Sequence, residues 1–213
     1  PTDLWVPVTR NITPMRSHQF ATGLFYSLKN IADFSMEGYY KTMDNLLEYK
    51  DGASFMGISA NWEDKVSVKG TAYGIELLAQ RSFSNTTGWI GYTWSKTNRI
   101  FNRPGNVLNN GRPFPAKYDR RHDISITAMH KFSKKTDISA SWVFSTGNVA
   151  TFGFHEYKIA DLPNYDSGFP HYGNLTQISS LNNFRYPNYH RLDLGINFHK
   201  ETRRGNRRTW NVS

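Results

Sequence analysis

The residues best suited to chemistry are His122 and Asp123, which stand side by side with Asp119 shortly before them. An imidazole beside a carboxylate could bind a metal ion or act as an acid–base pair. Adjacent side chains of a strand point to opposite faces, however, so His122 and Asp123 cannot converge on one ion. The spacing matches no known metal-ligand or catalytic pattern, and the chain has no cysteine. The sequence therefore predicts no enzyme activity, metal site or cofactor.

This segment favours a charged collar instead. Aromatic, acidic and basic residues follow one another just before a predicted strand, where a long connection would meet the wall of a sheet. The expected collar consists of Tyr118, Asp119, Arg120, Arg121, His122 and Asp123.

A second chemical feature is the basic run from His199 to Arg208. The chain has 26 Lys and Arg against 17 Asp and Glu, a net charge of +9 with His neutral, which suggests nucleic acid as a partner. Nucleic-acid modules usually interleave basic side chains with exposed aromatics, whereas these charges fall in one connection. The sequence therefore predicts a solvated turn and no nucleic-acid partner. Attraction to anionic lipid headgroups is a further hypothesis if the turn lies at a membrane surface.

The composition limits the elements that could position these residues. Aromatic residues make up 15% of the 213-residue chain, but hydrophobic residues only 38%, and the mean hydropathy is −0.62. A disordered basic chain would lack the aromatics, and a helical membrane protein would need apolar stretches of about 18 residues. The length suits one domain or part of a larger one. Because the chain lacks an initiating Met and ends within an expected strand, we expect an excerpt of a longer protein.

Alternation of apolar and polar residues predicts an all-β, antiparallel chain of about eight strands. In the clearest strand, Ile124 and Ile126 share one face while Ser125 and Thr127 share the other. The expected strands cover residues 18–28, 34–43, 71–81, 123–132, 137–145 and 191–199. A further strand is marked by the apolar face of Ile90, Tyr92 and Trp94, and an eighth starts near Trp210.

One hairpin register follows from polarity alone. If Phe132 pairs with Thr136 across a three-residue turn, the residue numbers of each pair in the hairpin add up to 268. Lys131 then faces Asp137, and the pairs Ile126–Trp142 and Thr127–Ser141 match in polarity, as sheet geometry requires.

Short and long connections alternate along the chain. The expected connections are residues 29–33, 44–66, 82–87, 98–121, 133–135, 147–188 and 200–208. Soluble sandwiches keep most connections short, whereas outer-membrane barrels have short periplasmic turns and long extracellular loops. Aromatics expected on or near strand ends suit a lipid headgroup level: Trp89, Trp94, Tyr92, Tyr39, Tyr40 and Trp142. The pattern therefore predicts an antiparallel transmembrane β-barrel segment, with a soluble carbohydrate-binding β-sandwich as the alternative.

The 147–188 connection is the expected ligand-contact region, because connections this long are usually functional or disordered and its aromatic content argues against disorder. Aromatic faces with a few polar groups suit a flat or sugar-like ligand, but they equally suit a loop folded over the barrel mouth. The candidate contacts are His155, Tyr157, Asp161, Tyr165, Asp166, His171 and Tyr172.

Six stretches, in order along the chain, resemble the barrel of TonB-dependent outer-membrane receptors, particularly those of Bacteroidetes. They are residues 1–7 (PTDLWVP), 36–43 (MEGYYKTM), 73–77 (YGIEL), 110–115 with 118–123 (NGRPFP and YDRRHD), 141–147 (SWVFSTG) and 209–213 (TWNVS).

The resemblance implies a 22-stranded barrel, plugged by an N-terminal domain and energised by TonB, in the outer membrane of a Gram-negative bacterium. Residues 1–213 would be about eight late strands of that single barrel domain, with the plug and the barrel C-terminus outside them. Implied partners are the TonB complex, the plug, outer-membrane lipid and a scarce nutrient that is a small molecule, glycan or peptide. A self-contained eight-stranded barrel, serving as adhesin or structural protein, is the main alternative.

A membrane barrel would turn its apolar residues outward. We therefore expect Ile124, Ile126, Ile138, Ala140, Leu194 and Ile196 to face lipid. The lumen would receive Ser125, Thr127, Ser139, Ser141, Asp193 and Asn197.

Overall fold

The computed structural model describes residues 13–49, 65–101, 109–153, 155–160, 172–177, 180–201 and 207–212. Within these ranges the chain is built of β-strands, joined by turns and one short 3₁₀ segment at Asn109–Gly111.

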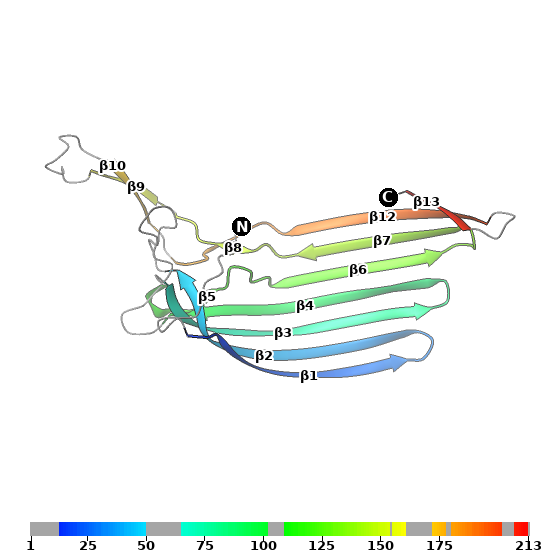
Figure 1. The fold of residues 1–213 in the computed structure, drawn as a ribbon, viewed down its shortest axis with the longest axis horizontal. Helices are drawn as coiled ribbons and strands as arrows, with labels where there is room; N and C mark the ends of the chain where they lie inside the picture. Colours follow the sequence, from blue (N-terminus) through cyan, green and yellow to red (C-terminus); the bar gives the residue numbers. More distant parts are fainter. Residues whose placement is uncertain are drawn as a thin grey trace.

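One antiparallel sheet dominates the fold (Figure 1). Its strand order is β1-β2-β3-β4-β6-β7-β12-β13, which follows the chain, and the short β5 adds to the end of β4. The strands are β1 (Arg16–Leu28), β2 (Ala32–Tyr49), β3 (Lys65–Phe83), β4 (Thr86–Ile100), β5 (Phe114–Pro115), β6 (His122–Lys131), β7 (Thr136–Ser145), β12 (Tyr189–Glu201) and β13 (Arg207–Val212).

The antiparallel all-β prediction is confirmed, and so is the predicted hairpin register. Lys131 pairs with Asp137, Ile126 with Trp142 and Thr127 with Ser141. Polarity matching was sufficient here because a shift of one residue would have exchanged the two faces of the whole strand.

Two expected strands were too short. The sequence places the β2 end at Met43 and the β3 start at Thr71, whereas the strands run to Tyr49 and from Lys65. The pairing is irregular between Met43 and Leu46, where Asn45 has φ 58°. A bulge shifts the alternation of side chains between the two faces. The apolar–polar pattern is therefore interrupted at a place where the strand itself continues.

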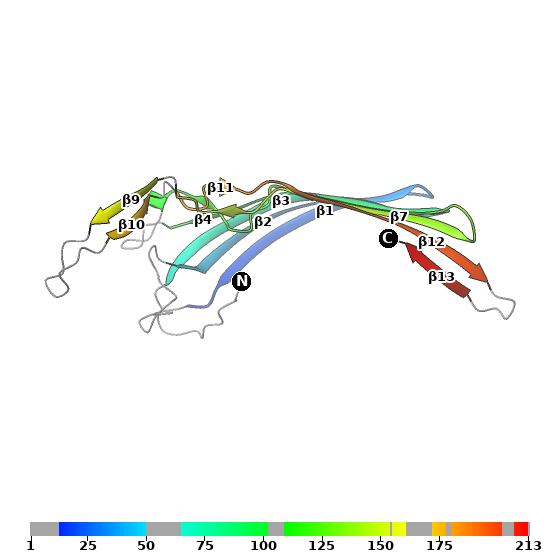
Figure 2. The same ribbon diagram turned by 90° about the horizontal axis from the view of Figure 1, so that it is seen from above.

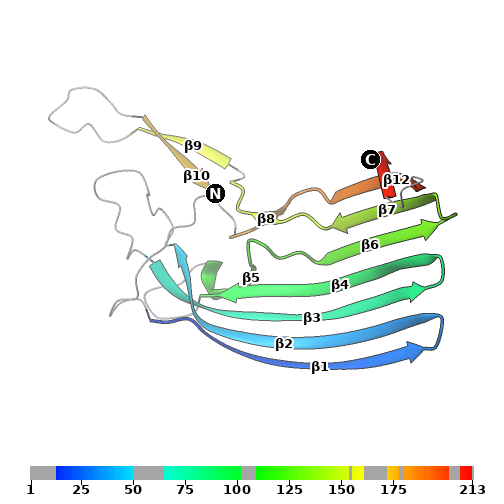
Figure 3. The same ribbon diagram turned by 45° about the vertical axis from the view of Figure 1, so that its right-hand side comes forward.

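Four further strands lie within the expected 147–188 connection, and the sequence did not predict them or β5. β8 (Val149–Ala150) pairs with β11 (Phe184–Arg185), and β9 (His155–Ala160) pairs with β10 (Tyr172–Gln177). The β9–β10 hairpin extends away from the main sheet (Figures 1 and 3). Such short pairings depend on neighbours distant in sequence, which periodicity does not report.

Connections of different length lie at opposite ends of the sheet. Residues 29–31, 84–85 and 132–135 join strands at one end, which we call the turn end. The connections from β4 to β6 and from β7 to β12 leave and rejoin the sheet at the other end, which we call the loop end (Figure 1). The sheet is arched rather than flat, with β1 and β13 as its two edges (Figure 2).

The register separates the side chains into two faces, because directly paired residues lie on the same face of a sheet. One apolar row runs through Ala79, Ile90, Ile126, Trp142 and Leu192. The neighbouring residues Gln80, Trp89, Thr127, Ser141 and Asp193 form a row on the opposite face. We call these the apolar face and the polar face.

The apolar face is uncovered among the described residues. Leu24 is 76% exposed and Leu194 is 64% exposed, although both lie in the middle of long strands. The buried hydrophobic cluster instead sits at the loop end, where Val68, Phe101 and Phe114 pack together with Leu46 and Leu181. A soluble sandwich would bury its larger apolar face, so this arrangement argues against that fold.

Aromatic side chains form a band on the apolar face. Phe20 pairs with Tyr40, the Tyr40 and Tyr73 rings stack at 6.3 Å, and the Tyr73 and Trp94 rings lie 5.9 Å apart. In β2, Phe34 precedes Tyr40 by six positions, or about 20 Å at strand spacing. This fits the apolar band of roughly 25 Å, flanked by aromatic girdles, of outer-membrane barrels.

The expected place of the aromatics at strand ends was partly wrong. Tyr40 and Trp94 lie inside strands because β2 and β4 extend beyond the apolar pattern. The register also puts Trp89 and Tyr39 on the polar face, opposite Thr127 and Gly74. Their residue types suit a headgroup level, but only the pairing decides which face they occupy.

Candidate functional site at the loop end

Asp119 is the centre of the loop end. It is 1% exposed, and its carboxylate is held between two guanidinium groups. Oδ2 accepts hydrogen bonds from Arg121 Nη2 at 3.1 Å and Arg185 Nη2 at 2.6 Å, while Oδ1 accepts one from the Thr97 amide at 2.7 Å. A buried carboxylate needs such partners, because an unpaired charge there would be strongly destabilising.

The backbone around Asp119 holds that carboxylate in place. The Asp119 amide donates to the Ala116 carbonyl at 2.8 Å, and the Ala116 amide donates to the Thr97 carbonyl at 2.9 Å. The segment before β6 is thereby pinned to β4. Ser95 adds two contacts, donating its hydroxyl to the Arg120 carbonyl and its amide to the Arg121 carbonyl.

Thr146 ties the end of β7 to the start of β6. Its hydroxyl oxygen accepts hydrogen bonds from the Arg121 amide at 2.7 Å and the His122 amide at 3.1 Å. Its own amide donates to the His122 carbonyl at 2.9 Å. The pairing of β6 with β7 starts at Asp123, just after these two amides. A side-chain oxygen thus accepts the hydrogen bonds that a neighbouring strand would otherwise accept.

Arg185 brings β11 to this centre. Its Nη1 donates to the carbonyl oxygens of Asp119 and Gly147 at 2.7 and 2.8 Å, in addition to the Asp119 ion pair. A Cβ on Gly147 would lie 2.1 Å from the Tyr186 carbonyl oxygen. The close backbone approach that Arg185 bridges thus requires glycine at this position.

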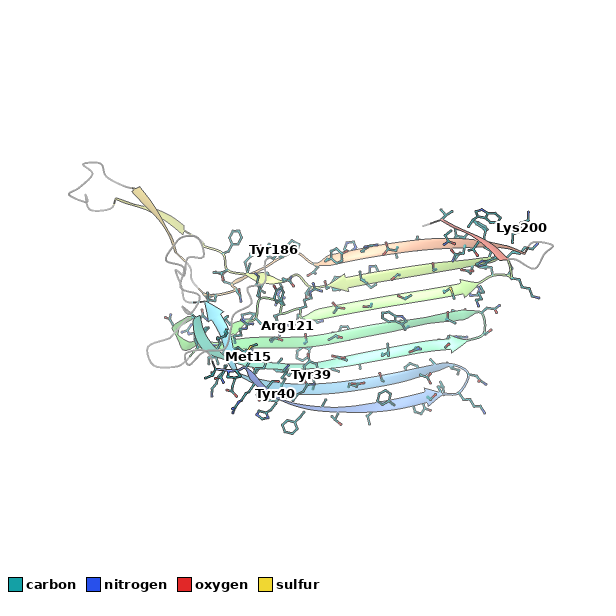
Figure 4. All side chains as sticks on the ribbon, viewed as in Figure 1. Met15, Tyr39, Tyr40, Arg121, Tyr186 and Lys200 are labelled. Atoms are coloured by element: carbon teal, nitrogen blue, oxygen red, sulfur yellow. The ribbon has the colours of Figure 1, made fainter. Side chains whose placement is uncertain are left out.

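A second set of contacts docks the two long connections onto each other. The Leu181 amide donates to Asn109 Oδ1 at 3.2 Å, and Asn182 Nδ2 donates to the Pro115 carbonyl at 2.7 Å. Leu181 also packs on the Phe101 and Phe114 pair, whose rings stack at 5.9 Å. Residues 109–121 and 180–187 therefore form one supported base, which we call the loop base. Arg121 and Tyr186 mark its position in Figure 4.

The six residues predicted as a collar lie in different surroundings. Asp119 and Arg121 belong to the buried centre, whereas Tyr118 is 70% exposed with Lys117 Nζ 5.8 Å from its ring. Arg120 bonds Asn148 Oδ1 at 3.2 Å and lies 3.8 Å from the Asp123 carboxylate. Their shared role as a collar remains a prediction.

His122 and Asp123 point to opposite faces, as alternation requires. His122 Nδ1 lies 2.9 Å from the Tyr92 hydroxyl with the rings stacked, on the apolar face, while Asp123 pairs with Thr93 and Ser145. In the part of the chain that the structure describes, no group of three or more His, Asp or Glu could hold a metal ion.

The predicted ligand contacts are only partly within the described residues. His155, Tyr157 and Tyr172 belong to one hairpin, in which they pair with Gln177, Leu175 and Ala160. Asp161, Tyr165, Asp166 and His171 lie outside the described residues. The ligand role of all seven remains a prediction.

Sequence reasoning missed Arg185 and Thr146, the residues that join distant segments to the centre. Neither lies in a local pattern, since Arg185 reaches Asp119 across 66 positions. One signal could have indicated an ion pair at Asp119. This residue falls in a segment with enough apolar and aromatic neighbours to be buried, and a buried carboxylate needs a cationic partner.

Comparisons with known proteins bear on the whole chain. The family model described as TonB dependent receptor-like, beta-barrel matches residues 2–213. Neither the curated proteins nor the solved structures gave a match. Across the described ranges, no helix has the length and apolar character needed to cross a membrane.

Proposed function

The chain belongs to the TonB-dependent receptor β-barrel family, and from that premise we propose that it forms part of the wall of an importer that carries a scarce nutrient across the outer membrane of a Gram-negative bacterium. Members of the family are outer-membrane receptors and transporters rather than enzymes.

The observation that carries the proposal is the division of the sheet into two faces. Ile126 and Leu194 lie on the exposed apolar face, and Thr127 and Asp193 lie on the polar face. Only a nonaqueous surrounding stabilises such an exposed face on long paired strands. The apolar face would contact lipid, and the polar face would line the lumen and contact a plug domain.

The open edges of the sheet favour a larger barrel over a self-contained one. In the described strands β1 and β13 occupy the two ends of the sheet and do not pair with each other. Unpaired strand edges inside lipid are strongly unfavourable, because no water satisfies their amides and carbonyls. Additional strands would supply the partners, in keeping with about eight late strands of a 22-stranded barrel.

The loop base would set the position of the extracellular loops. It is supported by the buried Asp119 centre and by the Leu181 contacts. The β9–β10 hairpin extends from this base (Figure 3) and contains His155, Tyr157 and Tyr172. Together with Asp161, Tyr165, Asp166 and His171, they are our proposed contacts for a small-molecule, glycan or peptide ligand.

TonB dependence distinguishes this function from that of a passive channel or an adhesin. The parent gene would be deleted, and growth measured on single nutrient sources at limiting concentration, with and without a working TonB. We expect one nutrient class on which the deletion strain and the TonB-deficient strain both fail, with growth restored by the intact gene. Uptake that persists without TonB, or growth unaffected on every source, would contradict the proposal.

A further inference from the structure

An open groove lies on the apolar face near the turn end, and the proposed transport function assigns no role to it. It has a volume of about 430 Å³ and crosses five strands. Its lining includes Thr86, His130, Ile138, Ala140, Leu194 and Val212.

The groove follows from a row of small residues. Gly88 pairs with Ala128, which pairs with Ala140. The adjoining row, toward the loop end, has Ile90, Ile126 and Trp142 in the corresponding places. A row of small side chains beside a row of large ones leaves a depression that a flexible hydrocarbon chain can fill.

A basic rim lies beyond the groove at the turn end. Lys134, Lys135 and Lys200 are all exposed, and among the described residues no carboxylate is within ion-pair distance of any of them. Asp137, the nearest acidic residue in the β6–β7 hairpin, is already bonded by Asn197 and His199 on the polar face. Among the described side chains, the rim therefore has positive charge without a carboxylate partner. Lys200 marks this end in Figure 4.

The backbone holds the rim together. The His199 amide donates to the Lys135 carbonyl at 2.7 Å, which places the β6–β7 turn beside the end of β12. Within that turn, the Ser133 hydroxyl oxygen accepts from the Lys135 and Thr136 amides, at 3.1 Å each. The three lysines thus come from two adjacent, hydrogen-bonded strand ends.

The spacing between rim and groove fits a lipid. Ile196, which lines the groove, precedes Lys200 by four positions on the same face of β12, or about 13 Å at strand spacing. One leaflet of hydrocarbon is about 15 Å deep, half of the 30 Å core. Phe198 and Trp210 pair between these levels and are 44% and 52% exposed, as rings at the headgroup boundary would be.

We propose that this surface binds one anionic phospholipid of the periplasmic leaflet, with an acyl chain in the groove and the phosphate against Lys134, Lys135 and Lys200. This inference rests on the proposed function, because the apolar face must contact lipid and the turn end must face the periplasm. Charge complementarity decides the occupant, since an anionic lipid brings net negative charge to the three ammonium groups, whereas the headgroup cation of a zwitterionic lipid cancels its phosphate and would be repelled by them.

Native mass spectrometry of the full-length receptor, purified folded from outer membranes, tests the proposal. Phosphatidylglycerol or phosphatidylcholine would be added in stepwise amounts. We expect one phosphatidylglycerol to be retained at a concentration at least five-fold below that needed for phosphatidylcholine. The triple change Lys134→Gln, Lys135→Gln, Lys200→Gln should remove this preference, as should Ala140→Phe, which fills the groove.

A matched control removes three charges elsewhere, by Lys41→Gln, Lys96→Gln and Lys117→Gln, and should keep the preference. Loss of the preference in this control, or its survival in either test variant, would overturn the proposal and leave only diffuse headgroup attraction. Equal retention of both lipids by a folded receptor would reject the lipid site alone. Absence of any folded receptor from outer membranes would reject the proposed function itself.

Discussion

Arg185 and Asp119 lie 66 positions apart, yet Arg185 Nη2 is 2.6 Å from Asp119 Oδ2 and Nη1 is 2.7 Å from the Asp119 carbonyl oxygen. Their side chains are 30% and 0% exposed. Arg185 of β11 thereby anchors the end of the β7–β12 connection beside the main sheet. The ion pair therefore joins two segments of the loop base that are far apart in the sequence.

Removing the carboxylate should destabilise the loop base strongly. Asp119→Ala leaves Arg185 and Arg121 without their shared partner, so we expect a loss of about 3 kcal/mol in the free energy of unfolding. Combining it with Arg185→Ala should show a coupling of about 1 to 3 kcal/mol in a double-mutant cycle. Denaturant unfolding of the receptor in detergent would measure both.

The control for this cycle is Asp123→Ala, which removes an exposed carboxylate 3.8 Å from Arg120. A change of less than about 1 kcal/mol is expected, because solvent screens such pairs. If the two aspartate variants lost equal stability, the buried centre would not have the role assigned to it.

Gly147 should not tolerate a side chain. In Gly147→Ala the new Cβ would meet the Tyr186 carbonyl oxygen at 2.1 Å, so we expect a loss of about 1 to 3 kcal/mol and faster proteolysis of the 146–188 connection. In Gly91→Ala the nearest atom is Trp89 Cζ3 at 3.4 Å, an ordinary contact. Limited proteolysis of the two variants should therefore differ clearly, and equal cleavage rates would count against the close approach.

The main sheet could be predicted from the sequence because each strand reports its own alternation. The Ile126–Trp142 pairing followed from polarity matching, since one face had to remain apolar throughout. Arg185, the β8–β11 pairing and the β2 extension beyond Asn45 were not predictable in this way. They depend on a contact across 66 positions, on two-residue strands and on a bulge, none of which leaves a periodic signal.

Deleting residues 161–175 tests the ligand proposal. The deletion removes the residues between β9 and β10 and the first four residues of β10, but it spares Arg185 and the loop base. We expect uptake to be abolished while surface display, measured by antibody labelling of intact cells, stays intact. Uptake at wild-type affinity would instead show that this hairpin is a lid or an antigenic surface.

The 213 residues alone should not form a transport-competent barrel. β1 and β13 are the edges of the described sheet, and lipid cannot satisfy their free amides and carbonyls. Refolding into detergent should give heterogeneous oligomers by size-exclusion chromatography. A monodisperse, heat-modifiable monomer would support the self-contained eight-stranded barrel.

The transport function requires the apolar face of the sheet to contact lipid, and two neighbouring residues of β6 allow this orientation to be tested. Ile126 lies on the apolar face, paired with Ile90 and Trp142, and Thr127 lies on the polar face, paired with Trp89 and Ser141. Arginine facing lipid at the bilayer midplane costs about 2 to 4 kcal/mol, whereas a lumen position tolerates it.

The measurement is the yield of heat-modifiable, folded receptor in outer membranes for Ile126→Arg and Thr127→Arg. We expect a severe loss of folded receptor for Ile126→Arg and near wild-type yield for Thr127→Arg. Equal yields, or a greater loss for Thr127→Arg, would mean that the apolar face does not contact lipid.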